Sequence, residues 1–228
     1  MTNKIFILTI SILVLIGCST KQKDDRTEFF PKIELKPNVI PNKENVWVFI
    51  LAGQSNMAGR GKVEPIDTIP DYRIFTINKK EELILAKEPL HFYEPTMTGL
   101  DCGLSFGKEL IKYKPDRISV LIIPTAVGGS SISQWINDST FRNVTLMTNF
   151  KEKIKVGQKY GTIKGVLWLQ GENDAITQAT IKIYNNQLQK LFTRFREEIN
   201  NSELPILIGQ LGSFSKTDDK WQAINHKI

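Results

Sequence analysis

The sequence predicts an α/β domain of three layers, in which helices cover both faces of a parallel β-sheet. Four unbroken apolar runs have the length of strands and are rich in β-branched and aromatic residues, which is typical of strands buried on both faces. Segments with apolar residues at helical spacing lie between and after these runs. Strands that alternate with helices indicate a parallel sheet wrapped by helices.

The elements follow from these patterns in chain order. The predicted strands are residues 46–52, 118–123, 166–169 and 204–208. The predicted helices are residues 103–113, 141–160, 177–200 and 218–226. The helix at 177–200 has the clearest pattern, with Ile181, Tyr184, Leu188, Leu191, Phe192 and Phe195 on one face.

Length and composition favour one globular domain. The chain has 228 residues, of which 41% are apolar and 24% charged. Two cysteines, Cys18 and Cys102, are too few for a disulfide scaffold or a cysteine-based zinc site. The net charge of +6 is spread along the chain without a run of five basic residues, so we expect a basic soluble surface and no nucleic-acid partner.

The N-terminus has the pattern of a secreted lipoprotein. Lys4 precedes an apolar run over residues 5–17, which is shorter than the roughly 20 residues that span a bilayer and fits a signal peptide. Leu15-Ile16-Gly17-Cys18 resembles the bacterial lipobox, which implies cleavage before a lipidated Cys18. The alternative is an ordinary signal peptide with a chance cysteine. We therefore expect a signal peptide at 1–17, a tether and linker at 18–45, and a lipid-anchored protein of the bacterial cell envelope, at the outer membrane or cell surface.

Unusual polar residues follow three of the four predicted strands, where ligands of parallel sheets bind. Gly53-Gln54-Ser55-Asn56-Met57 follows the first strand, and a serine at a strand-to-helix turn is either an exposed nucleophile or a helix N-cap. Gly128-Gly129 follows the second strand, where backbone N–H groups can form part of an oxyanion hole or only a tight turn.

The third strand is followed by Gln170-Gly171-Glu172-Asn173-Asp174. The Gln170 amide is a candidate oxyanion donor, and Glu172 is a candidate to orient a catalytic group or bind a sugar hydroxyl. We expect Asp174 to cap the helix that follows. No histidine accompanies these acids, so neither a metal ion nor another cofactor is expected.

Together the three blocks, the second with Trp135 and the third preceded by Trp168-Leu169, resemble the SGNH/GDSL hydrolase superfamily. More narrowly, they are similar to the sialate O-acetylesterases and to the acetylxylan esterases of carbohydrate esterase family six. The resemblance extends from about Val46 to the end of the chain. It implies a flavodoxin-like three-layer fold without metal, and a serine esterase that removes acetyl groups from a carbohydrate such as sialic acid or xylan.

The resemblance also implies roles for individual residues. Ser55 is then the nucleophile, and the oxyanion hole consists of the Ser55 N–H, a glycine N–H from the Gly128-Gly129 pair and the Gln170 amide. We favour Gly129 as the glycine donor. The remaining matched residues would bind substrate or support the site: Gln54, Asn56, Gly128 and Glu172.

One departure from the family pattern concerns the general base. The related enzymes carry an Asp-x-x-His block near the C-terminus, whereas this chain has two histidines, His91 and His226, and neither fits that block. We therefore expect residues 46–228 to form an esterase domain that is incomplete at its C-terminus. The alternative function is a catalytically inactive lipoprotein that binds carbohydrate or acts as a scaffold.

Overall fold

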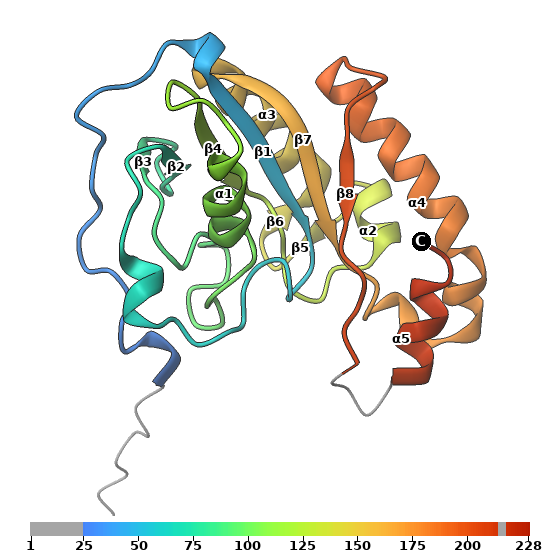
Figure 1. Cartoon of the computed structure of the whole chain (residues 1–228). Helices are drawn as coiled ribbons and strands as arrows, with labels where there is room; N and C mark the ends of the chain where they lie inside the picture. The colour runs from blue at the N-terminus through green and yellow to red at the C-terminus, as the bar shows by residue number, and fades with distance from the viewer. Residues whose placement is uncertain (1–24, 214–217) are drawn as a thin grey trace, which may run out of the picture.

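The computed structural model describes residues 25–213 and 218–228, which form a six-stranded sheet in the order β3-β2-β4-β1-β7-β8 (Figure 1). The strands of this sheet are β1 (Val46–Gly53), β2 (Ile74–Ile77), β3 (Leu83–Leu85), β4 (Ser119–Pro124), β7 (Thr162–Leu169) and β8 (Ile206–Ile208). β3 is antiparallel to β2, and the other neighbouring pairs are parallel. A separate two-stranded hairpin consists of β5 (Thr140–Phe141) and β6 (Val144–Thr145).

Helices lie on both faces of the sheet. They are α1 (Gly103–Lys112), α2 (Ile132–Ile136), α3 (Leu146–Tyr160), α4 (Gln178–Ile199) and α5 (Asp218–Asn225), and the short 3-10 helix η4 (Asp174–Ile176) precedes α4. In Figure 1, α1 lies in front of β4, whereas α3 packs on the opposite face against β1 and β7.

The alternation of side chains along β1 explains the three layers. Val48 and Ile50 belong to the larger hydrophobic cluster, which includes residues of α2, α3 and α4. Phe49 and Leu51 belong to the second cluster, which includes Leu104 of α1. Because both faces of this strand are buried, its sequence is a continuous apolar run rather than an alternating one. The predicted α/β fold is confirmed.

The predicted strands and helices occur close to their expected positions, with differences at the ends. The strand expected at 166–169 begins earlier, at Thr162. The helix expected over 141–160 begins at Leu146, because residues 140–145 form the β5–β6 hairpin. The sequence did not predict β2 and β3, and the antiparallel β3 makes the sheet mixed rather than wholly parallel.

The segment before β1, interpreted as a linker, contacts the domain over the part that the structure describes. The Arg26 side chain donates a hydrogen bond to the Met97 carbonyl (2.8 Å), and Lys87 Nζ donates one to the Ile33 carbonyl (2.6 Å). The Leu85 N–H of β3 donates to the Leu35 carbonyl (2.8 Å). The predicted signal peptide and Cys18 lie outside the described residues. Within the described residues, no helix has both the length and the apolar character needed to cross a membrane.

Candidate active site

The loops after β1, β4 and β7 meet at one edge of the sheet. The Gln54 N–H at the end of β1 donates to the Leu169 carbonyl at the end of β7 (3.1 Å). The Val127 N–H in the loop after β4 donates to the Gly53 carbonyl (3.1 Å). The three polar blocks identified in the sequence are therefore neighbours, as expected for the carboxyl ends of parallel strands.

Gly53 allows β1 to end against β7. Its φ of +139° is unfavourable for any residue with a side chain. A Cβ atom at this position would lie only 2.1 Å from the Leu169 carbonyl oxygen. A larger residue would therefore separate the two strand ends that carry Ser55 and Gln170.

Ser55 lies in a turn that immediately follows β1. The turn is closed by a hydrogen bond from the Ala58 N–H to the Gln54 carbonyl (2.8 Å), and the next helix in the chain is the short 3-10 helix Pro65–Thr68. Of the two alternatives that the sequence leaves open for Ser55, the helix N-cap is therefore wrong, because no helix begins at this residue. Its side chain is partly exposed, and neither its hydroxyl nor its backbone N–H has a hydrogen-bond partner among the residues that the structure describes.

The two glycines after β4 differ in the use of their N–H groups. The Gly128 N–H donates to a carboxylate oxygen of Glu94 (2.6 Å). The Gly129 N–H has no partner in the described part of the chain, and this residue is partly exposed with a φ of +81°. Of the pair, Gly129 is thus the residue whose backbone donor is free.

Gln170 is fully buried, and its amide is bonded to groups of the protein. Its Nε2 lies 3.1 Å from Gln54 Oε1, 3.1 Å from the Ser130 carbonyl and 2.5 Å from Asp174 Oδ2. Its Oε1 accepts a hydrogen bond from the Tyr184 hydroxyl (3.0 Å). An amide nitrogen has two N–H donors. In this arrangement both are directed at the loops themselves rather than at open space.

Gln54 and Asp174 complete this network. Gln54 Oε1 also accepts a hydrogen bond from the Asn173 N–H (3.2 Å), so its carbonyl end is fixed. Asp174 Oδ2 accepts one from the Ile132 N–H at the start of α2 (2.9 Å). The Asp174 carboxylate therefore binds the first N–H of α2, whose N-cap is Ser131, and it does not cap the following helix α4, whose N-cap is Thr177. Burial raises the pKa of Asp174, against the lowering effect of the Ile132 and Gln170 donors.

Asn56 and Glu172 form a polar pair beside Ser55. The exposed Asn56 amide donates to Glu172 Oε1 (2.6 Å). The other carboxyl oxygen of Glu172 is buried and has no hydrogen-bond partner among the described residues. Burial raises the pKa of Glu172, which the bond from Asn56 only partly offsets.

The two histidines are placed differently. His91 is buried, its Nδ1 lies 2.8 Å from Asp101 Oδ2, and its Nε2 accepts a hydrogen bond from the Ala126 N–H (3.2 Å). Both ring nitrogens are thus occupied, and His91 has a structural role in bracing the loop after β4. His226 is exposed beyond the end of α5, and its ring has no partner in the part of the chain that the structure describes.

Three charged residues at this edge were not identified from the sequence. Glu94 is buried between the guanidinium groups of Arg60 and Arg142, next to Gly128. All three lie in loops or a tight turn, where no periodic pattern marks a residue as functional. Among the described residues, no group of three or more His, Cys, Asp or Glu side chains could hold a metal ion.

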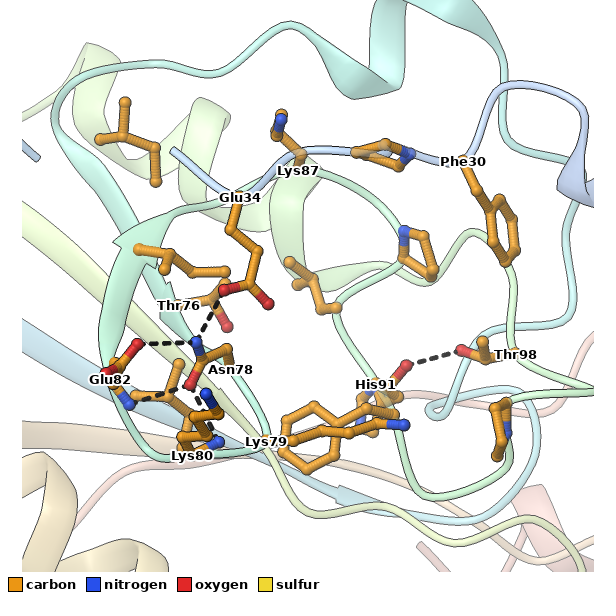
Figure 2. Close-up of a pocket in the computed structure, with 18 of the residues that line it drawn as sticks. Phe30, Glu34, Thr76, Asn78, Lys79, Lys80, Glu82, Lys87, His91 and Thr98 are labelled. Atoms are coloured by element: carbon orange, nitrogen blue, oxygen red, sulfur yellow. Dashed lines mark hydrogen bonds between the residues drawn. The ribbon is translucent and has the colours of Figure 1, made fainter. Parts of the chain in front are cut away.

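A cavity of about 660 Å³ lies in this part of the molecule, and Ser55 is not among the residues that line it. It lies between the N-terminal segment and β2–β3, where Figure 2 shows Asn78 bonded to Glu34 and Glu82. His91 and Thr98 form its wall on the side of the active-site loops. Ser55, Gly129 and Gln170 do not line this cavity.

Comparison with known proteins agrees with this architecture. A probable carbohydrate esterase of Arabidopsis thaliana is 30% identical over 77% of this chain and 71% of its own length. A crystal structure from the same plant has a TM-score of 0.68 and 28% identity, covering 79% of this chain and 80% of the other. The NanS crystal structure, at 18% identity, shares the fold with a TM-score of 0.65 over 82% of this chain and 74% of its own.

A carbohydrate acetylesterase from Xanthomonas citri also shares the fold, with a TM-score of 0.54 and 16% identity over 79% of this chain and 46% of the other. Residues 45–228 match the family described as carbohydrate esterase, sialic acid-specific acetylesterase. That match covers the whole six-stranded sheet and the three polar blocks that follow β1, β4 and β7. The chain therefore belongs to the carbohydrate esterases of the sialic acid-specific acetylesterase type, a family of carboxylic ester hydrolases.

Proposed function

We propose that the protein hydrolyses acetyl esters on carbohydrate hydroxyl groups, with Ser55 as the nucleophile. The observation that carries the proposal is the position of Ser55: it is partly exposed in a turn at the carboxyl edge of the sheet, and its hydroxyl is not bonded to any described group. In the reaction, Ser55 Oγ attacks the carbonyl carbon of the acetyl group, and the sugar oxygen leaves as a hydroxyl with the proton that Ser55 loses. Water then attacks the acetyl-serine, which releases acetic acid and restores the Ser55 hydroxyl.

The free backbone donors support an oxyanion hole beside this serine. We propose that the Ser55 and Gly129 N–H groups bind the developing negative charge, since both lack partners among the described residues. Gln170 would hold the three loops together from the buried side of the site, because its amide is bonded to Gln54, Ser130 and Asp174. Asn56, exposed and paired with Glu172, is placed to contact sugar hydroxyl groups.

Substitution of Ser55 tests the proposal. The purified chain is assayed for acetate release from O-acetylated sialic acid, acetylated xylan and 4-nitrophenyl acetate. Ser55→Ala is expected to lower kcat/KM by about 10³-fold or more, as for a nucleophile in a catalytic unit. Ser105→Ala, an exposed serine on α1, is the matched control and should keep full activity.

A second candidate function is carbohydrate binding without hydrolysis. It is favoured by the lack of any histidine bonded to Ser55 among the described residues, since a serine without a base is a weak nucleophile. Calorimetry with the same sugars separates the two. If the native chain and Ser55→Ala bind these sugars equally well and neither releases acetate, the protein binds carbohydrate and the proposed hydrolysis is wrong.

We also propose that Cys18 carries lipid and anchors the protein to the cell envelope. The support is the sequence Leu15-Ile16-Gly17-Cys18 after an apolar run, followed by a polar segment. Acyl chains contribute about 0.8 kcal/mol of membrane affinity per buried methylene, so a multiply acylated cysteine is a stable anchor.

A further inference from the structure

The loop after β4 is braced along its length by residues 91–94. The Ala126 N–H donates to His91 Nε2 (3.2 Å), and the Tyr93 hydroxyl donates to the Pro124 carbonyl (3.1 Å). A third hydrogen bond runs from the Gly128 N–H to the Glu94 carboxylate (2.6 Å), and it is the strongest of the three because its acceptor is charged. Glu94 thus fixes the residue that directly precedes Gly129.

Two arginines hold the Glu94 carboxylate in place. Arg60, from the loop after β1, donates to Oε2 (2.9 Å), and Arg142 donates to Oε1. Burial alone would raise the pKa of Glu94, but the Gly128 N–H and the Arg60 and Arg142 guanidinium groups hold it below its ordinary value. The side chain is therefore a carboxylate at neutral pH and bridges three separate loops.

Arg142 reaches Glu94 from an unusual backbone conformation. It occupies the two-residue turn of the β5–β6 hairpin with Asn143, and their φ values are +47° and +63°. A non-glycine residue in this left-handed region is strained and persists only where its surroundings fix it. The ion pair with Glu94 is one interaction that fixes it here.

There is no room for a side chain between Gly128 and this cluster. A Cβ atom at Gly128 would lie 2.0 Å from Arg60 Nη2 and 2.7 Å from Glu94 Oε2. By contrast, a Cβ atom at Gly129 would have no heavy atom nearer than 3.7 Å, and its closest neighbours belong to Arg142 and Phe141. Gly128 is therefore packed tightly against Glu94 and Arg60, whereas the space around Gly129 is open.

We propose that Glu94 is a positioning residue for ester hydrolysis, which holds the Gly128-Gly129 turn so that the Gly129 N–H meets the oxyanion. This inference rests on the proposed function of Ser55 and Gly129. A displacement of about 1 Å in such a donor is enough to lower a rate by about 10²-fold. The effect of Glu94 should therefore appear in kcat rather than in KM.

A second ion pair of similar kind provides a matched control. Lys153 of α3 is buried, and its Nζ lies 2.8 Å from Glu81 Oε1 in the turn between β2 and β3. Among the residues that the structure describes, neither side chain forms a hydrogen bond or an ion pair with the three active-site loops. Removing it should affect stability in the way that a merely structural ion pair does.

The experiment compares Glu94→Gln, Glu94→Ala and Glu81→Gln, with Ser55→Ala in the same assay on 4-nitrophenyl acetate. We expect Glu94→Ala to lower kcat by about 10–10²-fold with KM within about threefold. Glu94→Gln keeps a neutral acceptor for the Gly128 N–H, so it should recover part of this loss. Glu81→Gln should keep kcat within about twofold, whatever its effect on urea unfolding.

A second readout does not depend on turnover. The amide proton of Gly128, bonded to a carboxylate at 2.6 Å, is expected at low field in the nitrogen–proton NMR spectrum of the native chain. It should move upfield in Glu94→Gln, while other amide protons of the sheet stay in place. If Glu94→Ala does not fold, Glu94→Gln carries the test through both readouts.

The outcomes separate the two proposals. Values of kcat within about threefold of the native chain for both Glu94 variants would overturn the positioning role while leaving Ser55 hydrolysis intact. An unmoved Gly128 amide proton in Glu94→Gln would also overturn it. Hydrolysis that does not depend on Ser55 would instead overturn the proposed function, and the role of Glu94 with it.

Discussion

At the scale of single residues, the network around Gln170 shows how a polar residue can be buried without cost. Its amide and carbonyl groups are all bonded, to Gln54, Ser130, Asp174 and Tyr184. A buried polar group costs free energy only when its partner is missing. Removing Gln170 would therefore leave several partners unsatisfied at once.

Gln170→Ala is expected to lower the free energy of unfolding by about 1–3 kcal/mol. Urea unfolding measures this loss. The control is Gln189→Ala, an exposed residue of α4 that bonds Asn185, which should change stability by less than about 0.5 kcal/mol. Unchanged stability together with a loss of kcat by 10² or more would show instead that Gln170 donates directly to the oxyanion.

At the scale of elements, the segment between β3 and α1 carries a buried acid as well as Glu94 and His91. Glu88 is fully buried, one of its carboxyl oxygens has no hydrogen-bond partner among the described residues, and the other accepts a hydrogen bond from the Leu90 N–H (3.3 Å). Burial and the nearby Asp101 carboxylate raise the pKa of Glu88 well above its ordinary value of 4.5.

The raised pKa of Glu88 predicts a pH-dependent stability. The Glu88 carboxyl group loses its proton near the ordinary pKa in the unfolded chain, whereas in the folded chain it keeps the proton to higher pH. The contribution of Glu88 to the free energy of unfolding is therefore fully present below the ordinary pKa. It is lost as the pH rises through the folded pKa. Glu88→Gln lacks this titration. Its free energy of unfolding relative to the native chain should therefore rise by about 1 kcal/mol or more between pH 4 and pH 8.

Urea unfolding at pH 4, 6 and 8 measures the difference between the two proteins. Glu203→Gln, at an exposed position after α4, is the control for the loss of one carboxyl group at the surface. A difference between Glu88→Gln and the native chain that does not change with pH would contradict the prediction.

The elements found from the sequence are those with enough residues to show a pattern. β1 and α4 were predicted because a buried strand gives a continuous apolar run and an amphipathic helix repeats over several turns. β3 and the β5–β6 hairpin have three or two residues per strand, too few for any periodicity. The Arg142-Asn143 turn also lacks the glycine that usually marks such a hairpin.

The active site could be predicted in part for a related reason. Ser55, Gly129 and Gln170 follow predicted strands, so the topology of a parallel sheet brings them together. The free Gly129 donor and the saturated Gln170 amide depend on the direction of individual bonds, which no spacing encodes. Glu94 comes from a long irregular segment, and only the folded chain shows that it contacts Gly128.

At the scale of the whole molecule, the proposed lipid anchor predicts where the protein is found. In a bacterial host, the native chain should fractionate with membranes, whereas Cys18→Ala should be released in soluble form or remain as an uncut precursor. Cell fractionation and the mass of the mature chain measure both. Cys102→Ala is the control, since this cysteine lies in the folded domain at the start of α1. Identical fractionation of Cys18→Ala and the native chain would rule out the anchor.

The contacts of the N-terminal segment have a consequence for the outer edge of the sheet. β3 is the last strand on its side, and an uncovered outer strand offers unpaired N–H and carbonyl groups to strands of other chains. Here the Leu85 N–H is occupied by the Leu35 carbonyl of the protein's own segment (2.8 Å). If the proposed lipid anchor gathers copies on one membrane surface, such edges would come close together. The segment before β1 would then oppose the pairing of β3 with strands of other copies, because it already occupies part of this edge.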